Sequence, residues 1–225
     1  MTRQLAFDLP ALTAFRREDF FVSPANATAL AALDGWQGWP GGKMLIIGPR
    51  GSGKTHLAHL WAAEVGAALV TGAALSGADL PALAAQGAVA VEDAEATAGD
   101  PAAEAAFFHL HNLVTPAGRL LVTAATPPRD WGLTLPDLAS RLQAAPVTRL
   151  DAPDDALLSA VLIKLFADRQ ITVPPSLIPY LVARMERSIG AARALVAALD
   201  ARALAEGRPV TRQLAADLLD SQPTG

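Results

Sequence analysis

The sequence predicts an α/β protein, in which a parallel sheet with helices on both faces is followed by a small all-helical domain. Three observations lead to this fold class. A glycine-rich phosphate-binding motif stands between an apolar run and a helix-like run. Short apolar runs then alternate with helix-like runs, an order that builds a parallel sheet covered on both faces. After Pro153 the strand-like runs stop and only helical patterns remain.

The expected elements follow from these runs and from the turn residues between them. Strands are expected at 44–47, 67–71, 87–91, 119–124 and 147–150. Helices are expected at 53–65, 102–114 and 136–143, and then at 154–169, 175–187, 189–206 and 211–220. We therefore divide the chain into an arm at 1–14, an α/β domain at 15–152 and a helical lid domain at 153–225.

The composition limits the classes of protein to consider. The 225 residues suffice for one medium domain and a small one. Hydrophobic residues make up 52%, yet no uncharged run reaches the roughly 18 residues of a membrane helix. The absence of cysteine excludes thiolate chemistry and fits the cytoplasmic location that we expect. The net charge of −4 predicts neither membrane binding nor strong direct DNA binding.

The motif that decides most is Gly48-Pro49-Arg50-Gly51-Ser52-Gly53-Lys54-Thr55. Its glycines let successive backbone N–H groups turn inward and form a concave anion site. Lys54 is expected to reach the phosphates, and the Thr55 hydroxyl to hold Mg²⁺. The alternative is a chance glycine-rich turn, which the strand before and the helix after disfavour. The sequence therefore predicts ADP or ATP, with Mg²⁺, as the ligand.

Further charged residues are candidates for the same chemistry. Glu92 and Asp93 follow the third strand-like run, where they are expected to hold Mg²⁺ and water at the terminal phosphate. The alternative is a solvated acidic turn. Arg50, Arg141 and Arg193 are candidate phosphate contacts, because guanidinium groups bind phosphate in a bidentate manner. Each arginine taken alone is more often a solvated surface residue.

Together these motifs resemble the AAA+ family, and within it the branch of the bacterial replication initiator DnaA. The loop continues with His56-Leu57, as in that branch. Phe20-Phe21-Val22 with Asn26 resembles the segment that cradles the base, and Gly190-Ala191-Ala192-Arg193 resembles the sensor-2 element. Ser140-Arg141-Leu142 resembles the arginine finger that acts on a neighbouring protomer. The resemblance covers roughly residues 15–220 and implies nucleotide contacts by Phe21, Val22, Asn26, His56 and Arg193.

The sequence shows no helix-turn-helix domain after the predicted lid, whereas DnaA has one there. A DnaA-like module without that domain is similar to the Hda-type regulators, which promote ATP hydrolysis by DnaA together with the sliding clamp. Those regulators carry an N-terminal clamp-binding peptide, which residues 4–9 resemble through Gln4, Leu5, Phe7 and Leu9. The alternative is a loose terminus whose apolar residues fold back onto the domain.

Two positions depart from the family pattern. The Mg²⁺-holding position, normally aspartate, is Glu92, and the polar sensor-1 residue is replaced by Ala125, just before Thr126-Pro127-Pro128. Thr123 or Thr126 would substitute only if the turn geometry differs. We therefore expect tight nucleotide binding with weak intrinsic hydrolysis, so that the sequence leaves open whether the chain is an enzyme.

The resemblance implies a regulator that is tethered to the DNA polymerase sliding clamp and stimulates ATP hydrolysis by DnaA. Such a protein limits the initiation of chromosome replication. The alternative is an AAA+ helicase loader or remodeller that acts on DNA. A small-molecule kinase is disfavoured, because the helical lid with its Gly-x-x-Arg element looks like that of AAA+ proteins. The oligomeric state stays open, and a homo-oligomer is compatible with the sequence.

Overall fold

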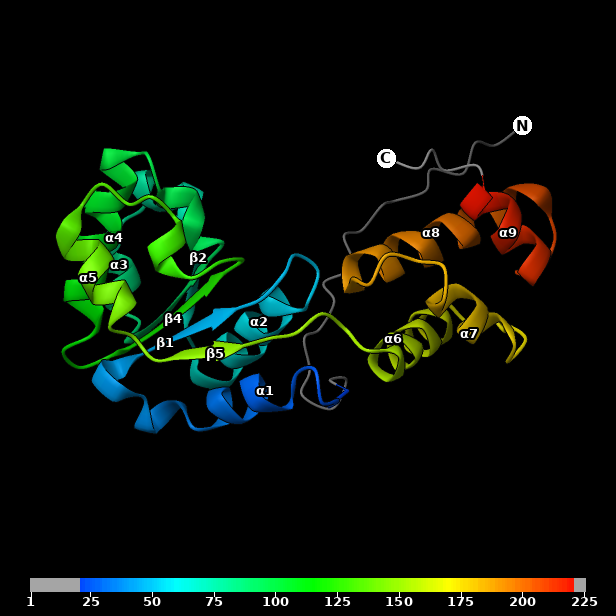
Figure 1. The fold of residues 1–225 in the computed structure, drawn as a ribbon, viewed down its shortest axis with the longest axis horizontal. Coiled ribbons are helices and arrows are strands. Elements are labelled where there is room, and N and C mark those ends of the chain that lie inside the picture. Colours follow the sequence, from blue (N-terminus) through cyan, green and yellow to red (C-terminus); the bar gives the residue numbers. More distant parts are fainter. Residues whose placement is uncertain (1–20, 221–225) are drawn as a thin grey trace, which may run out of the picture.

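The computed structural model describes residues 21–220, which form a sheet part and a helical part (Figure 1). The five strands of the sheet are β1 (Lys43–Ile47), β2 (Ala68–Thr71), β3 (Ala88–Glu92), β4 (Arg119–Ala124) and β5 (Val147–Arg149). The predicted strands are therefore confirmed to within one residue at each end.

All strand pairs are parallel, and the strands lie in the order β2-β3-β4-β1-β5. In this order β4 lies between β1 and β3. The segments that follow these three strands therefore meet at one edge of the sheet, which is where open parallel sheets bind ligands. That edge carries the phosphate-binding loop after β1 and the acidic turn after β3.

Helices cover both faces of the sheet (Figure 1). On one face α1 (Ala27–Asp34) and α2 (Lys54–Val65) pack around Trp61. On the other face α3 (Leu80–Ala84), α4 (Pro101–Val114) and α5 (Pro136–Gln143) pack around Phe107. The alternation of the strands supplies both cores, because in β4 Leu121 faces the first cluster while Leu120 and Val122 face the second.

Two of these helices, α1 and α3, have no counterpart in the sequence prediction. Short 3₁₀ turns complete the sheet part, at Trp36–Gly38, Pro40–Gly42, Gly72–Gly77, Ala94–Thr97 and Pro128–Asp130. Within residues 21–220, none of the helices is both long and apolar enough to cross a membrane.

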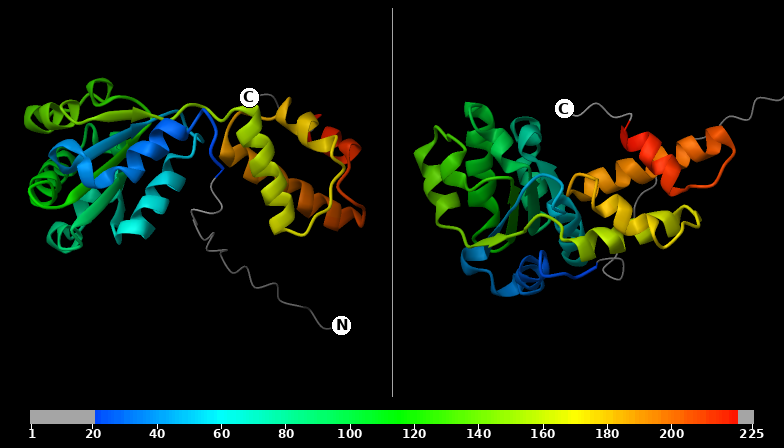
Figure 2. Two further views of the ribbon diagram at one scale, coloured as in Figure 1. Left: turned by 90° about the horizontal axis from the view of Figure 1, so that it is seen from below. Right: turned by 45° about the vertical axis from the view of Figure 1, so that its right-hand side comes forward.

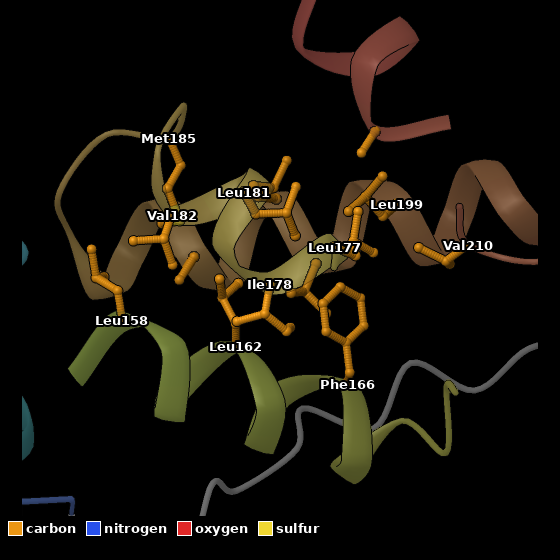
Figure 3. Packing of buried hydrophobic residues seen from close by; sticks show 14 of the residues in the cluster. Leu158, Leu162, Phe166, Leu177, Ile178, Leu181, Val182, Met185, Leu199 and Val210 are labelled. Atoms are coloured by element: carbon orange, nitrogen blue, oxygen red, sulfur yellow. The ribbon is translucent and has the colours of Figure 1, made fainter. Parts of the chain in front are cut away.

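Four helices form the C-terminal part, α6 (Asp155–Asp168), α7 (Leu177–Val182), α8 (Ile189–Glu206) and α9 (Arg212–Asp220). They enclose a core of their own, in which Leu162, Phe166, Leu181 and Leu199 are buried (Figure 3). The start of α6 is confirmed as predicted, since the backbone N–H of Leu157 donates to Oδ1 of Asp154 at 2.7 Å.

The prediction for α7 is wrong in its length, because the helix ends at Val182 and not at residue 187. Met185 stays in the lid core, as the apolar pattern indicates, but it belongs to a turn. The turn is held by Arg187, whose guanidinium donates to the carbonyl oxygen of Pro153 at 3.1 Å and pairs with Asp155 at 2.7 Å. These contacts tie the end of the turn to the start of α6 and redirect the chain into α8.

The two parts meet where α8 begins. The views of Figure 2 show α8, in orange, with its first turn beside the sheet part and its remaining turns pointing away from it. The backbone N–H of Ile189 donates to the carbonyl oxygen of Gly51 at 2.9 Å, which joins the lid directly to the phosphate-binding loop.

Candidate functional site

The phosphate-binding loop, residues 48–53, lies between β1 and α2 at the carboxyl edge of the sheet. Gly51 and Gly53 have φ angles of 74° and 108°, in the left-handed region that side chains disfavour. Gly53 directly precedes α2, so the backbone N–H groups of the first helical turn face the loop. The loop therefore presents the positive end of a 12-residue helix to the space in front of it.

Lys54 is buried against this loop. Its Nζ donates hydrogen bonds to the carbonyl oxygens of Gly48 at 2.7 Å and Pro49 at 3.0 Å. Burial lowers the pKa of Lys54, and the carboxylates of Glu95 and Asp93 oppose this shift. An ammonium group that is partly desolvated and held by neutral carbonyls is well prepared to contact an anion.

A cavity of about 470 Å³ opens between this loop and the first turns of α8. Three cationic side chains and two carboxylates converge on it, from three separate stretches of the chain. The lining residues are Arg50, Gly51, Gly53, Lys54, Thr55, His56, Asp93, Glu95, Ile189, Gly190 and Arg193.

Most of the residues predicted to contact the nucleotide thus lie together. Arg193 is the clearest case, because it comes from the lid and lines the same cavity as the loop residues. Gly48, Pro49 and Ser52 belong to the loop without lining the cavity. Ser52 is 2% exposed, and its Oγ has no hydrogen-bond partner within residues 21–220.

Glu92 lies elsewhere than the sequence pattern suggests. It is the last residue of β3, and its Oε1 is 3.3 Å from Nε2 of His59 on α2. Glu92 is not among the residues that line the cavity, whereas Asp93 is. The structure therefore brings one of the two predicted carboxylates to the phosphate loop.

Glu95 is the acidic cavity residue that sequence reasoning missed. It follows Asp93 in the Ala94–Thr97 turn, and its Oε1 accepts a hydrogen bond from the backbone N–H of Ala125 at 2.9 Å. Asp93 has a φ angle of 47°, a left-handed conformation that aspartate tolerates, and this bends the chain directly after β3. The signal in the sequence is a third carboxylate shortly after the strand, but its direction depends on that bend.

The turn after β4 offers no polar side chain to the cavity in place of Ala125. Thr123 is buried, and its Oγ1 accepts a hydrogen bond from the backbone N–H of Asp93 at 3.4 Å. Thr126 is exposed, and neither threonine lines the cavity. The condition under which either would substitute for the sensor-1 residue is therefore not met.

The lid closes on the loop with almost no space to spare. A Cβ atom added at Gly51 would lie 2.2 Å from Cβ of Ser188, a distance that real Cβ atoms do not show. Ser188 also caps α8, since its Oγ accepts from the backbone N–H of Ala191 at 2.9 Å. Glycine at 51 is thus required twice, by its φ angle and by the approach of the lid.

Phe21, Val22 and Asn26, predicted to cradle the base, lie beside the linker to the lid. Asn26 is buried, and its side chain folds the segment by accepting from the backbone N–H of Ser23 and donating to the carbonyl oxygen of Phe21, both at 2.9 Å. Phe21 and Val22 are exposed, at 45% and 53%. None of the three predicted base contacts is among the residues that line the phosphate cavity.

Arg141 lies away from this cavity, in the last turn of α5. Its side chain is exposed, and the guanidinium stands over the ring of Phe108 on α4, 5.5 Å from the ring centre. Its carbonyl oxygen accepts a hydrogen bond from Nζ of Lys43 at 3.0 Å. Because Lys43 is the first residue of β1 and the phosphate loop follows the last, Arg141 sits at the opposite edge of the sheet.

The predicted clamp contacts, Gln4, Leu5, Phe7 and Leu9, lie outside the described residues. They stay predictions, as do the domain boundaries at 14 and 152.

Comparison with known proteins gives one clear result, which concerns the fold. No family model matches the chain. Domain III of the Thermotoga maritima replication initiation protein DnaA has a TM-score of 0.80 at 20% identity, covering 96% of this chain and 100% of that one. AMPPCP-bound DnaA from Aquifex aeolicus has a TM-score of 0.68 at 16% identity, covering 83% of this chain and 65% of that one.

A third similar structure is a point mutant of Thermotoga maritima RuvB. Its TM-score is 0.66 at 18% identity, with 87% of this chain and 68% of that chain covered. The chain thus spans the whole of the DnaA domain III structure and about two thirds of the two longer proteins. It has the fold of a P-loop AAA+ domain, with a parallel five-stranded sheet and a helical C-terminal region as in domain III of DnaA.

Proposed function

We propose that the chain binds ADP or ATP in the cavity between the phosphate loop and α8. The observation that carries this proposal is the convergence of Arg50, Lys54 and Arg193 in front of the first turn of α2. Phosphate groups carry the opposite charge and accept the hydrogen bonds that guanidinium, ammonium and backbone N–H groups donate. The AMPPCP-bound DnaA structure of the same fold supports this class of ligand.

The residues present also fit Mg²⁺ as a companion of the nucleotide. Mg²⁺ prefers oxygen ligands and takes only one or two from a protein when phosphate oxygens are available. The Thr55 hydroxyl and the Asp93 carboxylate line the cavity and have this chemistry. A bound ion would neutralise part of the phosphate charge beside them.

We assign the base to the segment that contains Phe21, Val22 and Asn26. The backbone N–H of Asp151 donates to the carbonyl oxygen of Ala25 at 3.1 Å, which joins this segment to the linker between sheet and lid. A base held there would lie at the hinge of the two parts, and the exposed Phe21 and Val22 would offer it apolar surface.

The residues at this site favour weak intrinsic hydrolysis of ATP. Attack on the terminal phosphate needs a positioned water molecule. Ala125 has no side-chain group for that task, and Thr123 and Thr126 do not line the cavity. We therefore propose that the chain hydrolyses ATP far more slowly than an ordinary AAA+ ATPase does.

The regulatory part of the proposal rests on Arg141. An exposed arginine at the edge opposite the phosphate loop is suited to the nucleotide of a second molecule, for which DnaA is the candidate. An arginine supplied in trans raises phosphoryl-transfer rates by about 10³–10⁵. Stimulated hydrolysis by DnaA would limit the initiation of chromosome replication, and residues 4–9 would tether the chain to the sliding clamp.

The alternative function, a helicase loader or remodeller that acts on DNA, needs hydrolysis by the chain itself. ATP turnover distinguishes the two functions, first for the pure protein and then for DnaA with clamp and DNA, in the presence and absence of the chain. The regulator is slow alone and accelerates DnaA. Turnover of about 1–10³ s⁻¹ by the pure chain, without any effect on DnaA, would favour the loader.

A paired variant tests the tether in the same assay. Gln4→Ala with Phe7→Ala removes two predicted clamp anchors, a type of truncation that costs about 2 kcal/mol or more at an interface. Clamp binding and stimulation of DnaA should fall, while ADP affinity stays that of the wild type. Undiminished clamp binding in a pull-down would assign the tether to another part of the chain.

A further inference from the structure

Ala125, which stands in place of the polar sensor-1 residue, orients the side chain of Glu95. Oε1 of Glu95 accepts a hydrogen bond from the backbone N–H of Ala125 at 2.9 Å, so residue 125 acts here through its main chain. The hydrogen bond crosses from the turn after β3 to the turn after β4, at the same sheet edge as the phosphate loop after β1. It fixes one oxygen of the carboxylate and leaves the other to be explained.

The second oxygen, Oε2, is buried and has no hydrogen-bond partner within residues 21–220. Native structures rarely keep a buried polar atom without a hydrogen-bond partner, and the cation near this carboxylate is the Lys54 ammonium, whose pKa Glu95 raises. Glu95 also lines the cavity, together with Lys54 and Thr55. Glu95 therefore stands at the wall of the cavity, beside the groups that a bound ligand would contact.

Glu92 is engaged differently. Its Oε1 lies 3.3 Å from Nε2 of His59, and its side chain does not line the cavity. A glutamate that already has an imidazole partner on α2 would have to give up that contact to reach a metal ion at the loop.

We propose that Asp93 and Glu95, and not Glu92, are the carboxylates that hold the Mg²⁺ of the bound nucleotide. The proposal rests on nucleotide binding in this cavity and assigns its metal-binding residues. Two carboxylates, the Thr55 hydroxyl, phosphate oxygens and water molecules make up the oxygen set that Mg²⁺ prefers. Asp93, with its left-handed φ, directly follows β3, and its carboxylate and that of Glu95 both line the cavity.

The test is calorimetric titration of the full chain with ADP, in excess Mg²⁺ and in EDTA. Mg²⁺ should tighten ADP binding by the wild type. Glu95→Gln should lose about tenfold or more of this gain. In EDTA the same variant should bind ADP at least as tightly as the wild type, since a negative charge near the phosphates has been removed. General damage to the site would weaken binding in both buffers.

Matched variants complete the design. Asp93→Asn should behave as Glu95→Gln does, and it carries the test if the latter protein does not fold. Glu92→Gln should keep the Mg²⁺ gain, as should Glu64→Gln at an exposed position of α2. The assignment is overturned if Glu92→Gln loses the Mg²⁺-dependent gain in ADP affinity while Glu95→Gln keeps it. It is also overturned if the ADP affinity of the wild type does not depend on Mg²⁺. A wild type that binds no ADP at all overturns the proposed function itself.

Discussion

The two edges of the sheet hold their cations in opposite ways. At the carboxyl edge, Lys54 is buried and faces a cavity that the lid closes. At the amino edge, Arg141 is exposed. Its guanidinium lies over the ring of Phe108, and its carbonyl oxygen accepts a hydrogen bond from Lys43. The five residues of β1 separate the two edges by about 16 Å at 3.3 Å per residue.

This difference fits the two ligands that we propose. The buried Lys54 would contact a nucleotide that the chain encloses, whereas the exposed Arg141 would contact a nucleotide that another molecule presents. Substitutions at the amino edge should therefore leave ADP affinity unchanged, and substitutions at the carboxyl edge should leave the contact of Arg141 with its partner unchanged. The predictions below test that independence.

The largest effect is expected for Arg141→Ala. Stimulation of DnaA should fall by up to about 10³–10⁵, because the charge that develops on the partner's ATP loses its cation. ADP affinity of the chain should not change. Arg193→Ala should do the reverse and weaken ADP binding. Paired titrations of ADP affinity and DnaA turnover measure both, with Arg129→Ala at an exposed site as control. Full stimulation by Arg141→Ala would refute the trans-acting arginine.

Lys54→Ala should weaken ADP binding at the carboxyl edge by about 10- to 150-fold. The phosphates lose a charge-assisted contact of about 1.5–3 kcal/mol. Thermal melts with and without ADP check this, since a ligand that binds only the folded state raises its melting temperature. We expect a clearly smaller shift for the variant than for the wild type at the same ADP concentration. Equal shifts in both proteins would mean that the nucleotide binds elsewhere.

Glu104→Gln should destabilise the segment that leads into α5. The Glu104 side chain is buried and accepts hydrogen bonds from the backbone N–H groups of Gly99, Thr134 and Leu135, at 2.7–3.1 Å. Replacement by an amide should lower the free energy of unfolding by about 1–3 kcal/mol. Chemical denaturation at neutral pH measures the loss, with the exposed Glu186→Gln as control.

The same carboxylate predicts a dependence on pH. Burial raises the pKa of Glu104, but the hydrogen bonds it accepts outweigh burial and lower the pKa below its ordinary 4.5. A lowered pKa means that the stabilisation is fully present above pH 4.5 and is lost as the pH falls through the lowered value. Wild type and Glu104→Gln should therefore converge in stability in acid. A constant difference at every pH would contradict this account.

The smallest effect is expected for Lys43→Met. The Lys43 ammonium donates to the carbonyl oxygen of Arg141 and lies 3.1 Å from Nε2 of His111. Burial and this ammonium lower the pKa of His111 to about 4, so the ring is neutral and accepts the bond at pH 7. Without Lys43 the last turn of α5 loses an anchor, and stimulation of DnaA should fall roughly tenfold.

The control for Lys43→Met is Lys164→Met, which removes an exposed pair with Asp168 on the lid. In an Arg141→Ala background the Lys43 substitution should have no further effect on stimulation, because it acts through that arginine. An additional loss in the double variant would assign Lys43 a role apart from Arg141.

Local patterns in the sequence predict most of this fold. The strands are apolar runs with period two or with both faces buried, and Asp154 and Ser188 start helices as capping residues do. The end of α7 was missed because it depends on Arg187 reaching Pro153 and Asp155, residues far away in the chain. No local pattern encodes such a contact.

In the site too, local patterns predict some residues, whereas others depend on the folded structure. The phosphate loop and Arg193 are predictable because glycine spacing and a Gly-x-x-Arg element are local features. Which carboxylate enters the cavity is decided by the left-handed bend at Asp93 and by the partner that Glu92 finds on α2. No sequence pattern reveals either feature, so the sequence predicts two successive acids at the cavity, whereas Asp93 and Glu95 are the ones that line it.

Because Ser188 lies against Gly51, α8 begins at the phosphate loop and extends away from it. The helix has 18 residues and is therefore about 27 Å long. A tilt of about 10° at the loop would move its far end by roughly 5 Å over that length. Leu204, which is 83% exposed near that end, would carry the displacement to the surface. If nucleotide exchange tilts α8, the distance between a dye at Leu204 and one on the sheet part would change.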